Sequence, residues 1–291
     1  MLFRSRIAAA ALACTFASVA ALNGSAAPAA KASAEAPKFD IDPNSGELIG
    51  GPQVPALKPS EYTALGKLPD WSGDWGPNIA YMAEQNKTIQ PPWNAEGKRQ
   101  VQVYLDGVKS GKPIASTPSR CLPTGMPALM NQNHTFEFWF VPRRIFIFNE
   151  IDNTDMRRIY TDGRALPEDP DLSYMGYSVG HWEGKTLIVE TIGVLPEVPF
   201  RVNDRYNVEN GGDQYVLEHI YLKDEKTLVD DLEVKAPKVL TGPWKYSRQF
   251  IRHREPFFEI VESVCEQSGY DTVDSEGKAY FNFERHNEKD K

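Results

Sequence analysis

Apolar and polar residues alternate in short runs through the second half of the chain, and turn-forming residues separate the runs. This period of two is typical of strands with one buried face. The links at 142–143 and 183–184 have hairpin length, and no helical crossover separates the runs, so antiparallel pairing is expected. The expected strands are 135–141, 144–151, 156–161, 177–182, 185–192, 215–222, 227–235, 245–252 and 257–265.

This pattern predicts a mainly β fold, an antiparallel meander of about nine or ten strands that forms a closed barrel or a sandwich. One N-terminal helix is expected over 95–110, because Asn94 can cap it and Gly111 can end it. Residues 28–60 are rich in Pro and Ala and predict a tether. Residues 61–291 are expected to form a single β-rich domain.

The first residues have the pattern of an export signal. Arg4 and Arg6 precede an Ala-rich apolar stretch over 7–22, and small residues follow it. Residues 1–27 are therefore expected to be a signal peptide that directs the chain to the periplasm or out of the cell. The stretch is too short and too rich in Ala to predict a membrane span.

The cysteines agree with an oxidising compartment. Cys14 lies in the leader and leaves a lipoprotein signal open, although Ala11 stands where such a signal prefers Leu. Removal of the leader leaves Cys121 and Cys265, which are expected to form a disulfide after export. Two buried free thiols are the alternative.

Composition narrows the classes of function. The chain has 32 Lys and Arg against 40 Asp and Glu, a net charge of −8, which argues against a general affinity for nucleic acid or anionic membranes. Its five histidines lack H-x-H and H-E-x-x-H spacing, and no dinucleotide fingerprint occurs. A function without metal or cofactor is expected, and no pattern indicates an oligomeric state.

The expected hairpin over 144–161 carries unusual polar residues. With a four-residue loop at 152–155, Asn149 lies opposite Arg158 and Ile147 lies opposite Tyr160, all on one face. Arg158 and Tyr160 could then hold a carboxylate or a phenolate inside a barrel. A solvent-facing polar ladder is the alternative.

The expected hairpin over 177–192 has an apolar face, which includes Trp182, and a polar face. With a turn at 183–184, Tyr177 faces Glu190, and His181 lies on the same side. Histidine is the natural proton carrier near neutral pH, and a nearby carboxylate would raise its pKa. The alternative is a surface histidine beside a turn.

Four stretches resemble the motifs of an uncharacterised family of secreted bacterial proteins. They are MRRIYTDGR at 156–164, GHWEGKTLIVET at 180–191, CLPTGMP at 121–127 and ESVCE at 262–266. The resemblance extends from about Leu68 to Gln267 and implies export and a common fold. Gly73-Asp74-Trp75 is similar to the G-x-W position of lipocalins, which implies a calycin-like barrel with an apolar interior for a small ligand.

The leading functional prediction is an exported, cofactor-independent acid–base enzyme, a lyase, isomerase or hydrolase, that acts on a small aromatic or terpenoid-like molecule. In this hypothesis His181 moves the proton and Glu190 and Tyr177 assist it, while Arg158 and Tyr160 hold an oxyanion.

Two alternatives remain open. A periplasmic binding protein would hold the same apolar or aromatic ligand without turnover, in a cavity that also uses Asn149, Trp139 and Trp182. A structural envelope protein would need neither the cavity nor the titrating residues.

Overall fold

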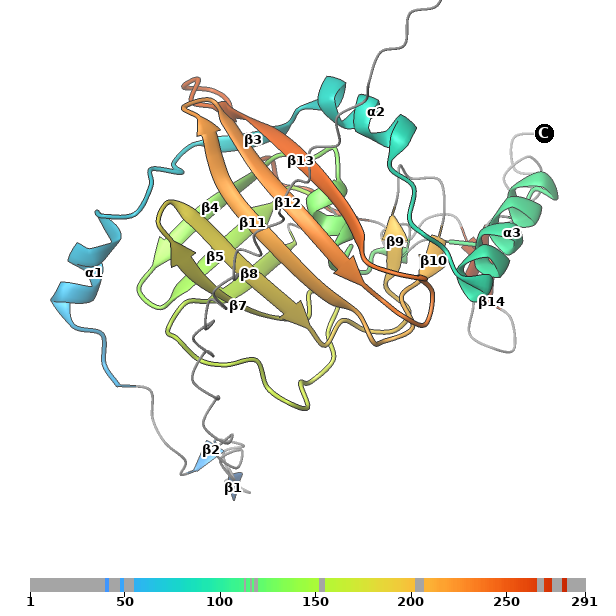
Figure 1. The fold of residues 1–291 in the computed structure, drawn as a ribbon, viewed down its shortest axis with the longest axis horizontal. Helices are drawn as coiled ribbons and strands as arrows, with labels where there is room; N and C mark the ends of the chain where they lie inside the picture. Colours follow the sequence, from blue (N-terminus) through green and yellow to red (C-terminus); the bar gives the residue numbers. More distant parts are fainter. Residues whose placement is uncertain are drawn as a thin grey trace, which may run out of the picture. The chain divides into compact units, whose positions relative to one another are not determined.

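The computed structural model describes residues 40–41, 48–49, 55–112, 114–115, 117, 120–151, 155–201, 207–265, 270–273 and 279–281. The expected signal peptide with Cys14, and most of the expected tether over 28–60, lie outside these residues. Nine of the described strands close into a barrel in the order β11-β12-β13-β3-β4-β5-β6-β7-β8 (Figure 1). The fold is therefore mainly β, as expected, and it is a barrel of calycin-like form rather than a sandwich.

The barrel strands agree closely with most of the expected runs. They are β3 (Asp74–Pro77), β4 (Phe136–Val141), β5 (Arg144–Asn149), β6 (Met156–Tyr160), β7 (Tyr177–Glu183), β8 (Thr186–Ile192), β11 (Tyr215–Asp224), β12 (Thr227–Lys235) and β13 (Trp244–His253). Alternate side chains point into the barrel, so that Leu187, Val189 and Thr191 of β8 are buried while their neighbours are partly exposed.

Three features differ from the expected meander. Strand β3 was not expected, and it closes the barrel by pairing with both β13 and β4. Strands β6 and β7 are parallel, because residues 161–176 return the chain to the start of β7 without a helix. The expected strand at 257–265 is wrong: these residues form no strand, and β13 already has β12 and β3 on its two sides.

The described residues form three α-helices where one was expected. They are α1 (Pro59–Leu65), α2 (Ile79–Thr88) and α3 (Ala95–Lys109), and a 3-10 helix, η2 (Ala128–Asn131), lies before β4. Helix α3 confirms the expected helix, with Asn94 Oδ1 accepting from Gly97 N at 3.0 Å. Its apolar residues Leu105 and Val108 are nevertheless exposed, because the helix buries only Gly97.

Short strands pair outside the barrel. They form the two-stranded sheets β1 (Asp40–Ile41) with β2 (Leu48–Ile49), β9 (Pro199–Arg201) with β10 (Asn207–Glu209), and β14 (Tyr270–Val273) with β15 (Ala279–Phe281).

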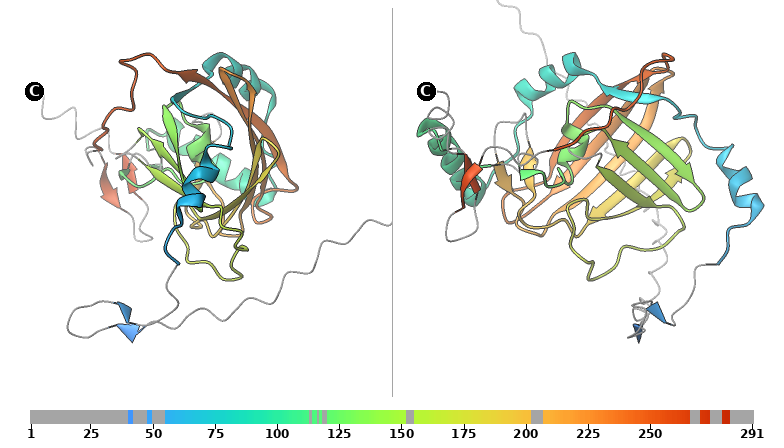
Figure 2. Two further views of the ribbon diagram at one scale, coloured as in Figure 1. Left: turned by 90° about the vertical axis from the view of Figure 1, so that its left-hand side faces the viewer. Right: turned by 180° about the vertical axis from the view of Figure 1, so that it is seen from behind.

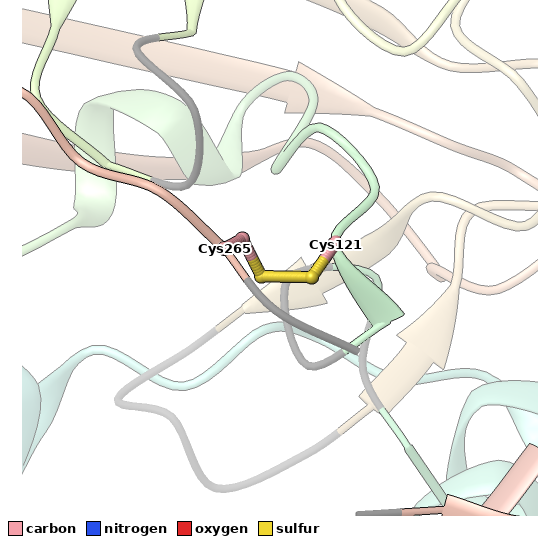
Figure 3. The surroundings of a disulfide bond; sticks show 2 residues. All are labelled: Cys121 and Cys265. Carbon is pink, nitrogen blue, oxygen red and sulfur yellow. A yellow bond between two sulfur atoms is a disulfide. The ribbon is translucent and has the colours of Figure 1, made fainter. Parts of the chain in front are cut away.

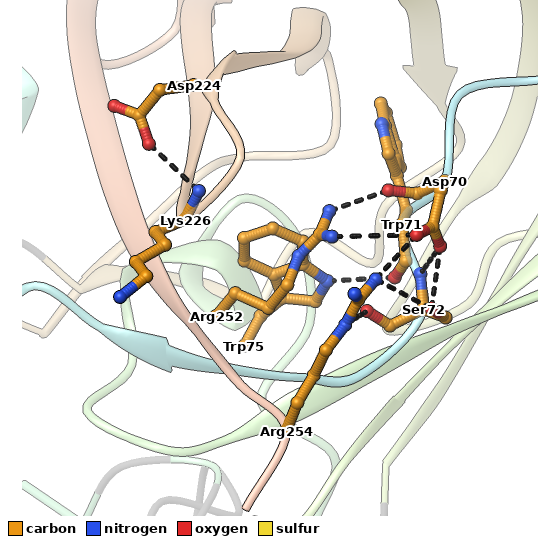
Figure 4. Close-up of polar contacts among 8 residues, drawn as sticks. All are labelled: Asp70, Trp71, Ser72, Trp75, Asp224, Lys226, Arg252 and Arg254. Carbon is orange, nitrogen blue, oxygen red and sulfur yellow. Dashed lines mark hydrogen bonds and ion pairs between the residues drawn. The ribbon is translucent and has the colours of Figure 1, made fainter.

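A stack of side chains fixes the first barrel strand to the last one (Figure 4). The guanidinium of Arg252, on β13, lies 4.6 Å from the ring centroid of Trp75, on β3. Its Nη2 donates to the carbonyl of Asp70 at 2.6 Å, and Arg254 Nη2 donates to the Asp70 carboxylate at 2.5 Å. Hydrogen bonds from Ser72, followed by the Arg254 charge, hold the pKa of Asp70 well below its usual range.

Cys121 and Cys265 are within disulfide distance, which agrees with the expected pair (Figure 3). Their Cα atoms are 5.5 Å apart although 144 positions separate them in the sequence. The bond joins the segment before η2 to the segment that follows β13. Among the described residues, no helix is both long enough and apolar enough to cross a bilayer.

Two kinds of side chain fill the barrel, and β7 carries both. Trp182, near the end of β7, packs in an aromatic cluster with Trp71 and Phe140. Ser178, near the start of β7, lies beside the buried Arg157 of β6. One end of the barrel is therefore aromatic, whereas the interior near the start of β7 is polar.

Candidate functional site

The wall of the barrel has a gap where the pairing between β6 and β7 ends. Their parallel pairing covers only two residue pairs, Ile159 with Ser178 and Tyr160 with Val179. On the N-terminal side of these pairs the strands diverge around a hollow of about 470 Å³, called here the fork hollow. Its lining is Pro123, Asp155, Met156, Arg158, Tyr160 and residues 171–178. This volume is within the range of small-molecule sites.

Two tyrosines form an aromatic wall of the fork hollow. The rings of Tyr160 and Tyr177 are stacked, with centroids 5.0 Å apart and planes inclined by 27°. Arg164 lies 3.9 Å from the Tyr160 centroid and donates to the Tyr177 hydroxyl at 2.9 Å. Because Asp162 bonds the same guanidinium, Arg164 is fixed behind the tyrosines and its own charge is matched.

Arg158 supplies an unmatched positive charge to the fork hollow. Its side chain is exposed on the outer face of β6, and its guanidinium lies 5.7 Å from the Phe146 centroid. Neither this guanidinium nor the Tyr160 hydroxyl makes a hydrogen bond or an ion pair with any described residue. The two groups are therefore available to a ligand, and a guanidinium is suited to a planar carboxylate.

The floor of the fork hollow touches a buried polar network. Ser178 lines the hollow, and its hydroxyl accepts from Arg157 at 3.4 Å. Arg157 forms a two-bonded ion pair with Glu218 of β11, at 2.7 and 2.5 Å, and both side chains are fully buried. Thr191 Oγ1 also accepts from Arg157 at 3.0 Å. Arg157 therefore links β6 to β7 through Ser178, to β8 through Thr191 and to β11 through Glu218.

A second buried acid lies deeper in the same interior. Asp230 of β12 is fully buried, and neither carboxylate oxygen has a hydrogen-bond partner. Arg248 is directly opposite on β13, but its guanidinium bonds Asn131 Oδ1 at 2.9 Å instead. Burial, and then the Glu218 charge, raise the pKa of Asp230 well above its usual range. Burial likewise lowers the pKa of Arg248.

The structure brings Arg158 and Tyr160 together, but on the outside of the barrel. Ile147 pairs with Arg157, and Phe146 pairs with Arg158, three positions away from the expected register. The loop between β5 and β6 is longer than four residues, and an odd shift reverses the faces. The expectation that Arg158 and Tyr160 point into the barrel is therefore wrong.

The second hairpin keeps its expected faces, but its register also differs. Glu183 pairs with Thr186 across a turn at 184–185, so Val179, not Tyr177, is opposite Glu190. His181 is 58% exposed and contacts Glu183 at 3.3 Å. Glu190 instead accepts from the Tyr215 hydroxyl at 2.6 Å. Tyr177 lines the fork hollow, whereas His181 and Glu190 do not.

The other expected binding residues lie apart from the fork hollow. Trp182 is in the aromatic end of the barrel, and Trp139 is exposed on β4, where it packs on Phe148 at 4.3 Å. Asn149 is buried, and its Oδ1 accepts from Ile151 N at 2.9 Å. These three residues and the fork hollow do not form one site.

Sequence reasoning missed the interior residues of the network, namely Arg157, Ser178, Thr191, Glu218, Asp230 and Arg248. For Glu218, Asp230 and Arg248 a signal was present on strands β11, β12 and β13, where each charged residue occupies an otherwise apolar inward position. In the described part of the chain, no cluster of three or more His, Cys, Asp or Glu side chains could hold a metal ion.

Comparison with known proteins does not assign the chain to a family. No protein-family model matches the chain, and no curated protein matches it either.

Proposed function

We propose that this chain is a binding protein for small aromatic anions, and that it holds them in the fork hollow. The carrying observation is the unmatched guanidinium of Arg158 beside the stacked rings of Tyr160 and Tyr177. The rings offer a flat apolar surface, and the guanidinium offers two parallel donors to a carboxylate.

Rigid support around the fork hollow favours binding without a large conformational change. Arg164 donates to Tyr177, and the buried Arg157 links β6 to Ser178 of β7 and to Glu218 of β11. Preorganised groups lose little conformational entropy when a ligand binds, which strengthens binding.

The acid–base enzyme hypothesis has less support. It requires a base within hydrogen-bond reach of a bound substrate, and His181 is outside the fork hollow, exposed, and beside Glu183. Glu190, its expected partner, is bonded to Tyr215. A binding role needs only the residues that line the hollow.

Export to an oxidising compartment completes the proposal. The leader pattern over 1–27 and the Cys121–Cys265 pair both support it. An extracytoplasmic binding protein of this kind would meet its ligand in the periplasm or outside the cell.

Isothermal titration of the full chain with 4-hydroxybenzoate and with neutral 4-hydroxybenzamide tests the proposal. We expect the anion to bind more tightly by about tenfold or more, since a hydrogen bond to a charged group contributes about 1.5–3 kcal/mol. Chromatography of the mixture after prolonged incubation should return unchanged 4-hydroxybenzoate. Equal affinities, or no binding, would contradict the proposed ligand class, and conversion to a product would contradict a role in binding alone.

A further inference from the structure

A segment before the barrel crosses its aromatic end and is clamped at two points. This segment, residues 55–72 with helix α1, is called here the strap, and the left view of Figure 2 shows α1 across the end of the barrel. At the first clamp Arg143 donates to both carboxylate oxygens of Glu61, at 2.6 and 3.0 Å, and to the carbonyl of Pro55. The second clamp joins Asp70 to Arg252 and Arg254 (Figure 4).

Between its clamps the strap covers two hollows, of about 390 and 370 Å³. Both are lined by Leu65 and Leu68 of the strap and by Phe140 of β4. Trp182 lines the first and Trp71 lines the second, and these two rings are 5.1 Å apart in an edge contact. The hollows therefore adjoin across one aromatic floor.

From Pro55 to Asp70 the strap is held by its clamps rather than by packing, whereas Trp71 near its end is buried in the aromatic cluster. Helix α1 buries none of its residues, and Leu65 and Leu68 are each only partly buried. Phe140 and Trp182 on the floor are also only partly buried. Apolar surface remains on both sides of the gap, and a molecule that fills it would remove that surface from water.

Apart from Arg144, the charged groups around the strap hollows form ion pairs with one another. The pairs are Glu61 with Arg143, Asp70 with Arg254 and Asp162 with Arg164. Arg144, which lines the first hollow, lies 5.4 Å from the Tyr160 centroid. No carboxylate among these residues is left to attract a cation. The second hollow, which Arg144 does not line, has matched charges and aromatic walls that suit an uncharged ligand.

We propose that the space beneath the strap is a second binding site, which takes a neutral, apolar ring compound, and that the strap is its lid. This site is separate from the fork hollow in its residues and in the charge of its ligand. Leu65 and Leu68 close over the compound, and the Glu61–Arg143 pair limits how fast the lid opens.

Fluorescence titration with the neutral probe N-phenyl-1-naphthylamine tests the site. The parent chain should bind the probe, and Leu68→Arg should weaken binding by about tenfold or more, because a charge in the hollow would lose hydration. Leu65→Arg is the second variant at the site. Tyr62→Arg adds the same charge on an exposed position of α1 and should bind as the parent does. Circular dichroism confirms that each variant is folded.

The lid has its own readout. Glu61→Gln removes one charge of the clamp, so probe release measured by stopped flow should become several times faster. Glu84→Gln removes the same charge from an exposed ion pair with Lys87 on α2 and should leave release unchanged. No binding by the parent, or unchanged binding by both folded Leu variants, would overturn the second site. An unchanged release rate in Glu61→Gln would overturn the lid.

Discussion

At the scale of single residues, the most informative position is Arg157. In the sequence Met156-Arg157-Arg158-Ile159-Tyr160, two adjacent arginines point to opposite faces of one strand. Arg157 is fully buried against Glu218, while Arg158 is exposed beside the fork hollow. Composition and spacing do not distinguish these two residues, because only the strand register decides which one faces inward.

The buried pair makes a first prediction. Arg157→Met should destabilise the fold by about 3–5 kcal/mol, because it leaves Glu218 charged and buried without its partner. The double variant Arg157→Met, Glu218→Leu should recover a large part of this loss, since it removes both charges. Urea denaturation of the parent, Arg157→Met, Glu218→Leu and the double variant measures the coupling energy between the two side chains. Additive losses would show that the pair is not coupled.

Asp230 makes a second prediction, on pH. Its folded-state pKa is raised, so the folded state holds the proton more tightly than the unfolded state does. This contribution to stability is present at low pH and is lost as pH rises from the ordinary carboxyl range toward the raised pKa. The gain from Asp230→Asn should therefore grow with pH in that window, by about 1.4 kcal/mol per unit at most.

Asp224→Asn is the control for this prediction. A hydrogen bond from Lys226 N lowers the pKa of Asp224, so this variant should lose stability, relative to the parent, as pH rises through the acid range. Thermal unfolding from pH 2 to pH 8 measures both variants, because the change for Asp224 falls below the ordinary carboxyl pKa and the change for Asp230 falls above it. A pH-independent effect of Asp230→Asn would contradict the buried, protonated carboxyl.

At the scale of elements, alternation along the chain predicted eight barrel strands within a few residues of their ends. Alternation did not predict the pairing of a very short strand, or the pairing that a long connection sets. Strand β3 is only four residues long and contains Gly76 and Pro77, so it has little strand pattern. The parallel pairing of β6 and β7 depends on a 16-residue connection, and this pairing creates the fork hollow.

Loop length explains the misplaced candidate site. A four-residue loop between β5 and β6 was assumed, whereas the pairing runs from Asn149 to Asp155, whose carbonyl accepts from Asn149 N at 2.9 Å. This difference of three positions exchanged the inner and outer faces of β6. The sequence correctly predicts that Tyr160 and Arg158 lie on the same face of β6, but that face is outside the barrel.

His181 makes an element-scale prediction. Because it lies on the outer face of β7, apart from the fork hollow, His181→Gln should change the free energy of unfolding by less than about 0.5 kcal/mol. Its affinity for 4-hydroxybenzoate should equal that of the parent. Calorimetry and urea denaturation measure the two quantities. A large loss of affinity for 4-hydroxybenzoate in His181→Gln would contradict this prediction and would place His181 in the binding site.

At the scale of the whole molecule, one covalent link joins distant parts of the chain. The barrel closes through β3, and the Cys121–Cys265 bond then fixes the segment after β13 to the segment that leads to η2. The sequence alone predicted this pair from the cysteine count after removal of the leader. It did not predict which parts of the fold the bond joins, because that depends on barrel closure.

The disulfide makes a whole-molecule prediction. Closing a loop of 144 residues lowers the entropy of the unfolded chain, which corresponds to about 5 kcal/mol as an upper limit. Cys121→Ser together with Cys265→Ser should therefore lower the urea midpoint, and a reducing agent should do the same to the parent but not to the double variant. Two thiols titrated in unreduced, denatured protein that was expressed in an oxidising compartment would contradict the bond.

The central claim is that Arg158 gives the fork hollow its preference for anions, and one measurement tests it most directly. It is the affinity for 4-hydroxybenzoate, by isothermal titration, of Arg158→Gln against Arg144→Gln. Both variants remove one positive charge from the outer face of the barrel, and Arg144 also contacts the Tyr160 ring, but only Arg158 lines the fork hollow. We predict that Arg158→Gln weakens binding by about tenfold or more, to the affinity of neutral 4-hydroxybenzamide, while Arg144→Gln stays within about twofold of the parent. Equal losses in the two variants, or none in Arg158→Gln, would contradict this account.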